Sequence, residues 1–290
     1  MRLSELGEHG LLAELDRLGL ARGIDGDAAE LGGLVITQDA LVEGVHFRLE
    51  WTSWHDLGYK AAAVNLSDLA ATGAEPEALI VSLALPGDTA VDDVLELYRG
   101  LCEPAVPILG GDTSSAERLY LSVTALGRSP RVPGRGGAQP GDSLVVTGPL
   151  GASAAGYLAL CHGMESDLVE AHLRPPLRLR EGRELAQRAH AMIDLSDGLA
   201  ADAGHIAARS GCKLVIELDR TPIAEGVASV AKRLGEDVWE LACGFGEDYE
   251  LLAAVPEAAP DAIGRCEPGS GVELRLRGRV LELTGWDHFR

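Results

Sequence analysis

The stretch Lys60-Ala-Ala-Ala-Val-Asn-Leu-Ser-Asp-Leu-Ala-Ala-Thr-Gly-Ala-Glu-Pro76 decides how the rest of the sequence is interpreted. With the residues just before it, this stretch predicts a helix over Asp56–Thr72. The helix is rich in alanine and apolar on most faces, which indicates that it is buried. Asp68 lies inside this helix. Because an unpaired buried carboxylate is costly, Asp68 is predicted to bind a ligand or to form an ion pair.

Short apolar runs and helical patterns alternate on both sides of this helix. In the first half, helices are predicted over 3–20 and 91–102, and strands over 34–39, 77–85, 105–109 and 119–128. In the second half, helices are predicted over 152–161, 178–189, 201–210 and 227–234, and strands over 143–147, 213–218, 249–255 and, as a pair, within 271–283. This mixture predicts an α/β or α+β fold.

A segment rich in proline, arginine and glycine separates the two halves. It runs from Ser129 to Asp142 and contains few apolar residues, as is typical of a linker. A chain of 290 residues is long enough for about two domains. We therefore predict one domain over 1–130 and a second over 140–290.

The charge balance limits the classes of partner. The chain has 45 Asp and Glu against 25 Lys and Arg, a formal net charge of −20. Nucleic-acid backbones and anionic membranes are bound by basic surfaces, so we expect neither as a partner. A phosphate-rich small substrate fits this charge when a divalent cation is bound, because the cation inverts the local charge.

The sequence carries no signal of secretion or of a membrane span. The first ten residues are charged where a signal peptide needs an apolar run. The longest uncharged stretch, Ser143–Gly163, is interrupted by glycine and proline. The five cysteines are scattered without a Cys-x-x-Cys pair, which favours buried free thiols in a reducing compartment. We expect a cytoplasmic protein.

Isolated acidic residues recur at loops and at the ends of apolar runs. Each could be a turn or capping residue, and for Asp194 and Asp197 the alternative is a simple N-cap of the following helix. Together, carboxylates from different strands could hold Mg²⁺ ions against a polyphosphate, because Mg²⁺ prefers oxygen ligands and substrate phosphates. The residues are Asp27, Asp39, Asp68, Asp112, Asp194, Asp197, Glu247 and Asp248.

Other signatures of phosphate chemistry are missing or weak. Gly148–Gly156 follows a strand and opens a helix, but it fits neither a dinucleotide-binding motif nor a P-loop, which favours tight strand–helix packing. The catalytic motifs of protein kinases are absent from the sequence. Arg135 lies in the linker, where it is either solvated or able to contact a phosphate.

Several motifs, taken in order, resemble the thiamine-monophosphate kinase family. They are the opening stretch, Gly26-Asp-Ala-Ala, Thr37-Gln-Asp-Ala-Leu-Val-Glu-Gly-Val-His-Phe47, Gly110-Gly-Asp-Thr, Arg135-Gly-Gly-Ala-Gln-Pro-Gly-Asp142, Met192-Ile-Asp-Leu-Ser-Asp-Gly-Leu199, Gly246-Glu-Asp-Tyr-Glu-Leu251 and Gly285-Trp-Asp-His-Phe289. The resemblance implies a two-domain fold like that of aminoimidazole ribonucleotide synthetase, with N-terminal domains paired in a homodimer. It also implies ATP-dependent phosphorylation of thiamine monophosphate to thiamine diphosphate, by direct transfer without a covalent catalytic residue.

The resemblance also implies roles for single residues. Trp286 beside a cationic thiazolium ring makes sense as a cation–π contact. Mg²⁺ would be held by Asp27, Thr37, Asp39, Asp68, Asp112, Asp194 and Asp197; ATP would be contacted by Gly111, Asp112, Arg135 and Ser196; the thiamine moiety or its phosphate would be contacted by His46, Glu247 and Trp286. Two alternatives stay open: the same fold acting on another small phosphate acceptor, and a non-catalytic nucleotide-binding or metal-binding subunit.

Overall fold

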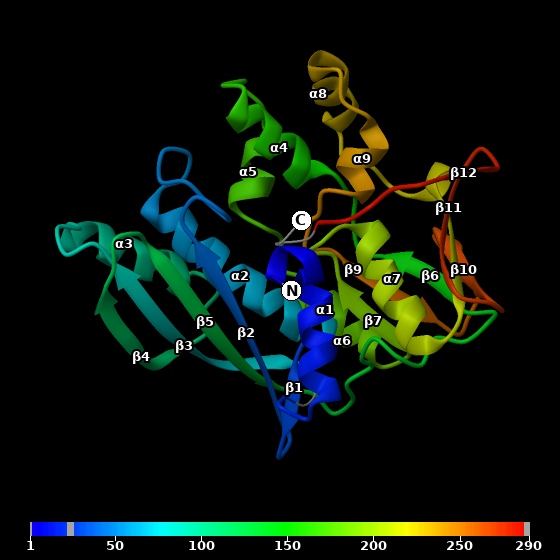
Figure 1. Ribbon diagram of the computed structural model, residues 1–290, viewed down its shortest axis with the longest axis horizontal. Helices are drawn as coiled ribbons and strands as arrows, with labels where there is room; N and C mark the ends of the chain where they lie inside the picture. Colours follow the sequence, from blue (N-terminus) through cyan, green and yellow to red (C-terminus); the bar gives the residue numbers. More distant parts are fainter. Residues whose placement is uncertain (1, 22–25, 287–290) are drawn as a thin grey trace.

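The described residues form two β-sheets that lie side by side, one from each half of the chain (Figure 1). The computed structural model describes residues 2–21 and 26–286, so residues 287–289 of the C-terminal motif lie outside the described part. Helices pack on both sheets, and the predicted mixed α/β architecture is confirmed. No helix in the described part is long and apolar enough to cross a membrane.

The N-terminal sheet has five strands in the order β1-β2-β5-β3-β4. Only β3 and β4 run parallel to each other. The helices α2 and α3 bury one face of this sheet through a core of leucine, valine and alanine side chains. The strands are β1 (Ala29–Leu31), β2 (Leu34–Val42), β3 (Glu75–Leu85), β4 (Ile108–Ser115) and β5 (Tyr120–Arg128); the helices are α1 (Leu3–Arg17), α2 (Trp54–Ala71) and α3 (Val91–Cys102).

The C-terminal sheet has seven strands in the order β12-β11-β8-β10-β6-β9-β7, and only β11 and β8 are parallel. Its strands are β6 (Ser143–Val146), β7 (Ala191–Asp194), β8 (Lys213–Glu217), β9 (Leu251–Val255), β10 (Gly264–Glu267), β11 (Gly271–Leu276) and β12 (Arg279–Leu281). Its helices are α4 (Ala152–Cys161), α5 (Leu168–Leu173), α6 (Leu179–Ala186), α7 (Leu199–Ser210), α8 (Val227–Leu234) and α9 (Val238–Cys243), with a 3₁₀ turn at Leu218–Arg220.

The helix α2 connects the two halves, as its alanine-rich sequence allows. Ser53 caps its first turn by accepting a hydrogen bond from the Asp56 backbone. Most of the helix is buried, which confirms the prediction from its composition. Its last turn, with Ala70 and Ala71, packs against Met192 of β7 and against α6. The side chains of α2 therefore contact elements of both halves.

Several elements differ from the sequence prediction. The strands β1, β7 and β10 and the helices α5 and α9 were not predicted, because three to six residues are too few to display a period. The strand predicted over 105–109 in fact runs from Ile108 to Ser115, so that Gly110-Gly-Asp-Thr is strand rather than loop. All five cysteines are free, but Cys102 and Cys161 are exposed, contrary to the prediction of buried thiols.

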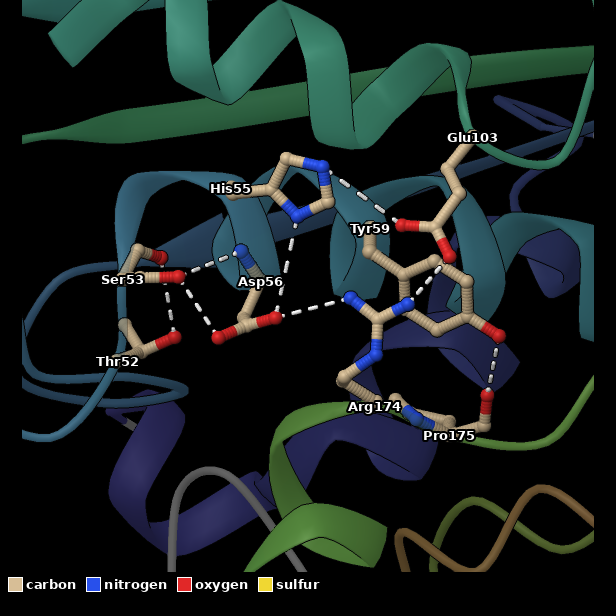
Figure 2. Close-up of polar contacts among 8 residues, drawn as sticks. All are labelled: Thr52, Ser53, His55, Asp56, Tyr59, Glu103, Arg174 and Pro175. Carbon is tan, nitrogen blue, oxygen red and sulfur yellow. Dashed lines mark hydrogen bonds and ion pairs between the residues drawn. The ribbon is translucent and has the colours of Figure 1, made fainter.

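An arginine after α5 fixes the second half of the chain to α2 (Figure 2). The guanidinium of Arg174 contacts Asp56 at 2.9 Å and Glu103 at 2.5 Å, and lies 4.0 Å from the ring centre of Tyr59. Tyr59 donates a hydrogen bond to the carbonyl of Pro175. Burial alone would raise the pKa of Asp56, but its bonds to Ser53 and Arg174 lower it. The cluster ties the chain just after α5 to the first turns of α2.

Two glycines allow α2 and α3 to cross at backbone contact. A Cβ atom added at Gly58 would lie 1.9 Å from the carbonyl oxygen of Leu97, and one added at Gly100 would lie 1.9 Å from that of His55. Backbone cannot yield as a flexible side chain can, so any larger residue must force the helices apart.

We therefore predict that Gly100→Ala lowers the free energy of unfolding by about 1–3 kcal/mol, because the added methyl group overpacks this crossing. The measurement is equilibrium unfolding in denaturant. The matched control is Gly204→Ala in α7, where an added Cβ meets no atom within 4 Å; alanine there should stabilise the helix by about 0.5–1 kcal/mol. Equal stability of the two variants would contradict the prediction.

Candidate active site

A cavity of about 510 Å³ is lined by residues from both halves of the chain. Its size suits a small-molecule ligand. Most of the residues that the resemblance implied contribute to its wall, although they come from separate parts of the sequence. These residues are Asp27, Thr37, Asp39, His46, Asp68, Arg135, Asp194, Ser196, Asp197, Glu247 and Trp286.

Three carboxylates converge in this cavity. Oxygens of Asp27, Asp68 and Asp194 lie within 4.8 Å of one another. Burial raises the pKa of Asp68 well above its usual range, and the neighbouring carboxylates of Asp39, Asp194 and Asp27 raise it further. Burial and the charge of Asp27 raise the pKa of Asp194 to about 8. Burial and mutual repulsion both oppose the joint ionisation of these carboxylates, and positive charge close by favours it.

Each carboxylate of this cluster is held by one fixed neighbour. Thr37 donates to Asp68, Ser67 donates to Asp194 at 2.7 Å, and Arg135 contacts Oδ1 of Asp27 at 2.7 and 3.0 Å. Oδ2 of Asp27 is buried and has no hydrogen-bond partner in the described part of the chain. A buried orphan oxygen next to two further carboxylates fits an oxygen-preferring divalent cation such as Mg²⁺.

The loop that carries Asp194 and Asp197 does not serve as a plain helix cap. Asp194 ends β7, and α7 begins only at Leu199. The N-cap residue is Gly198, which makes no side-chain capping bond. The capping alternative for the two aspartates therefore does not describe this loop.

Two of the three predicted substrate residues are attached to the same loop by backbone hydrogen bonds. The amide of Glu247 donates to the carbonyl of Ser196 at 2.9 Å, and the amide of Trp286 donates to that of Asp197 at 3.0 Å. At Gly246, φ is +88°, and an added Cβ would lie 2.2 Å from the Ser196 carbonyl oxygen. Glycine at position 246 thus lets the two segments approach.

Glu247 forms a polar cluster with two buried partners, which sequence reasoning missed. Its Oε2 lies 3.1 Å from Nζ of Lys60 and 3.2 Å from Nδ1 of His172. Burial alone would raise the pKa of Glu247, but Lys60 and His172 lower it to about 2. Neither partner lies at a motif spacing to Glu247, so no local sequence signal could have paired them.

A second acidic cluster surrounds Asp197. Ligand atoms of Asp197, Asp202 and His205 lie within 4.8 Å of one another. Asp202 is buried and accepts a hydrogen bond from the Asp197 amide at 3.2 Å. Burial, and then the charges of Asp197 and Asp194, raise the pKa of Asp202 well above its usual range. Asp202 and His205 are three residues apart on α7, which begins directly after Asp197-Gly198. This spacing was a signal that could have identified the two residues from the sequence.

The Gly-rich stretch after β6 has a packing role, as predicted. An added Cβ at Gly156 would lie 2.2 Å from the carbonyl oxygen of Leu168. The backbone amides of Gly151 and Ser153, where α4 begins, donate to the carboxylate of Asp248 at 2.8 and 3.3 Å. Burial raises the pKa of Asp248 to about 7 despite these bonds. The carboxylate of Asp248 thus occupies the backbone amides at the start of α4 to which a phosphate group would otherwise bind.

Two predicted residues lie away from the cavity. Gly111 and Asp112 are exposed on β4, the outer edge of the N-terminal sheet (Figure 1). The strands β3 and β5 separate β4 from β2, a distance of about 14 Å at the usual strand spacing. Neither residue lines the cavity of its own chain.

Family comparisons agree with this architecture. Residues 25–129 match the AIR synthase related protein N-terminal domain, and residues 139–282 match the C-terminal domain of the same family. Among solved structures, the hydrogenase maturation protein HypE in complex with ATP superposes with a TM-score of 0.73 at 20% identity, over 97% of this chain and 96% of that one, and so shares the fold.

More similar relatives cover the full length. Thiamine-monophosphate kinase from Aquifex aeolicus is 37% identical over 100% of both chains, and that from Mycobacterium tuberculosis is 36% identical over 99% of this chain and 93% of the relative. A solved structure described as AaThiL complexed with AMPPCP and TMP superposes with a TM-score of 0.91 at 37% identity, covering 99% of each chain. The chain belongs to the thiamine-monophosphate kinase family.

Proposed function

We propose that this protein transfers the terminal phosphoryl group of ATP to thiamine monophosphate, giving thiamine diphosphate and ADP. The observation that carries the proposal is the cavity, which combines convergent carboxylates at Asp27, Asp68 and Asp194 with the predicted substrate residues Glu247 and Trp286. The full-length relatives named thiamine-monophosphate kinase support the same activity.

Mg²⁺ is the cofactor that suits the carboxylate cluster. The orphan oxygen of Asp27 and the oxygens of Asp68 and Asp194 form an all-oxygen donor set, to which Thr37, Asp39 and Asp197 add further oxygens on the cavity wall. Bound Mg²⁺ would neutralise phosphate charge and help to align the two substrates.

The protein's own residues then act by position and charge. Arg135 has the guanidinium geometry to contact a phosphate while it holds Asp27. His46, Glu247 and Trp286 lie where they can orient the acceptor, and the hydrogen bonds of the last two to the Ser196–Asp197 backbone fix that acceptor relative to the carboxylates. Direct transfer requires this alignment and no covalent nucleophile.

A homodimer explains the position of Gly111 and Asp112. These residues lie about 14 Å from their own cavity wall, so a role in ATP or Mg²⁺ binding needs a second copy of the chain. The face of the N-terminal sheet opposite α2 and α3 exposes Ile80 and Tyr120, and Leu109 of the edge strand is also exposed. An exposed edge strand beside apolar side chains favours pairing with another chain. The domain boundaries at 130 and 140 and the cytoplasmic location stay predictions.

Asp197→Asn tests the activity. We expect it to lower kcat/KM for thiamine monophosphate by about 100-fold or more, because one carboxylate that holds the cation is lost, while the melting temperature stays within a few degrees of wild type. The measurement is thiamine diphosphate formation with ATP and Mg²⁺, alongside ADP release with aminoimidazole precursors. ATP binding without ADP release from wild type would instead favour the non-catalytic alternative.

Asp68→Asn tests the metal site. Mg²⁺ should raise the melting temperature of wild type and have little effect on this variant, because binding to the folded state alone stabilises it. Without Mg²⁺, the variant should be at least as stable as wild type, since one of three repelling carboxylates has been removed. Thermal unfolding with EDTA and with Mg²⁺ measures both effects, and an equal response to Mg²⁺ would remove Asp68 from the site.

Mixed dimers test the shared site. Asp112→Asn and Asp197→Asn should each be inactive alone, whereas their co-expression should restore about a quarter of wild-type activity. Half of randomly assembled dimers are mixed, and each mixed dimer has one intact site only when Asp112 comes from the opposite subunit. No restored activity in a dimer whose composition is verified by mass spectrometry contradicts a shared site.

A further inference from the structure

Lys60 is a buried cation that the predicted mechanism leaves without a role. Its side chain is 3% exposed, and its Nζ contacts Glu247 from across the boundary between the two halves. A buried ammonium needs a partner, and removing that partner is strongly destabilising. The ion pair therefore constrains the Glu247 side chain, unlike an ion pair between two exposed side chains.

His172 completes the cluster from α5. Its Nδ1 lies 3.2 Å from the same Oε2 of Glu247 and 3.0 Å from the hydroxyl oxygen of Ser153. Burial and then the Lys60 ammonium lower the pKa of His172, so the ring is neutral at pH 7. An ionised carboxylate only accepts, so the proton of the neutral ring is assigned to Nδ1, which donates to Glu247.

The backbone of Glu247 is also constrained. Its φ is +57°, a left-handed conformation that is costly for a residue with a side chain. The hydrogen bond from its amide to the carbonyl of Ser196 and the ion pair with Lys60 hold Glu247 in this conformation. Both of the side-chain contacts use Oε2, and Oε1 has no partner in the described part of the chain. Because Glu247 lines the cavity, Oε1 is available to a ligand.

We propose that Lys60 and His172 are positioning residues that keep Glu247 as an acceptor-only carboxylate, and that Oε1 of Glu247 selects a substrate ring that carries an amino group or positive charge. This inference rests on the proposed function, because it assigns a recognition role to the acceptor site of that reaction. A carboxylate without a proton rejects a substrate that offers an oxygen in place of the amino group, since two acceptors then face each other unpaired.

The charged and titratable groups that face Glu247 come from four places in the fold. Lys60 lies on α2, His172 on α5 and Tyr157 on α4, and Tyr249 follows two residues later in the chain. Lys60 carries the ammonium group that pairs with Glu247. Its removal should therefore raise the pKa of Glu247, because of the groups named here only His172 then opposes the effect of burial.

The first test is Lys60→Met. We expect KM for thiamine monophosphate to rise about tenfold or more at pH 6, while KM for ATP stays within about twofold. The ratio of variant to wild-type KM should fall between pH 6 and pH 9, because Glu247 regains its charge as the pH rises. Lys213→Met is the matched control, since Lys213 pairs with Glu273 away from the cavity, and its ratio should stay near one at every pH.

A double-mutant cycle separates positioning from general damage. In a Glu247→Gln background, Lys60→Met should have no further effect on KM for thiamine monophosphate, because both changes act through one carboxylate. Additive effects, a KM ratio that does not vary with pH, or an unchanged KM in Lys60→Met would each overturn the inference. If wild type forms no thiamine diphosphate, the proposed function fails and the inference falls with it.

Glu247→Gln gives a readout that does not depend on the folding of Lys60→Met. The probe is the thiamine monophosphate analogue in which a carbonyl oxygen replaces the pyrimidine amino group. Wild type should prefer the amino form in kcat/KM by about 100-fold or more, and the variant should lose at least about tenfold of that preference, because an amide can donate as well as accept. An unchanged preference in the variant would overturn the role of Glu247.

Discussion

The site depends on the close approach of carboxylates in a buried cavity. Asp27, Asp68 and Asp194 place oxygens within 4.8 Å of one another, where burial and mutual repulsion both oppose ionisation. One arginine, Arg135, pairs with only one oxygen of one member. Such an arrangement is unfavourable for folding by itself. Bound cations would offset this cost, and they would let a chain of net charge −20 accept the phosphate-rich substrates of the proposed reaction.

The fold holds these groups together through α2 and a short loop. Small side chains let α2 pack closely against elements of both halves, and Asp68 projects into the cavity from this rigid element. Asp194 ends β7 and Asp197 lies in the loop that follows, and the carbonyls of this loop accept hydrogen bonds from the amides of Glu247 and Trp286. The side chains proposed to bind the cation and those proposed to bind the acceptor are therefore positioned by the same few peptide groups.

Much of this could be predicted from sequence, and the remainder could not for physical reasons. The composition of α2 predicted its burial, and the burial predicted a special role for Asp68, because both follow from local pattern. The contact of Lys60 with Glu247 joins residues 187 positions apart, so it follows only from the packing of the two halves. Asp112 was assigned to the site by motif, yet its strand lies at the far edge of the sheet.

The charged groups around Asp68 and those around Glu247 have opposite effects on the carboxyl pKa values. Around Asp68, burial and then neighbouring like charges raise the carboxyl pKa values, an effect that a bound cation would oppose. Around Glu247, Lys60 and His172 lower the pKa to about 2, so that carboxylate is charged with or without a ligand. The carboxylates around Asp68 would thus respond to a bound cation, whereas Glu247 keeps a constant hydrogen-bonding character. Because the carbonyl of Ser196 accepts a hydrogen bond from the amide of Glu247, the loop after β7 fixes the position of Glu247 relative to the carboxylate cluster, as the proposed reaction requires.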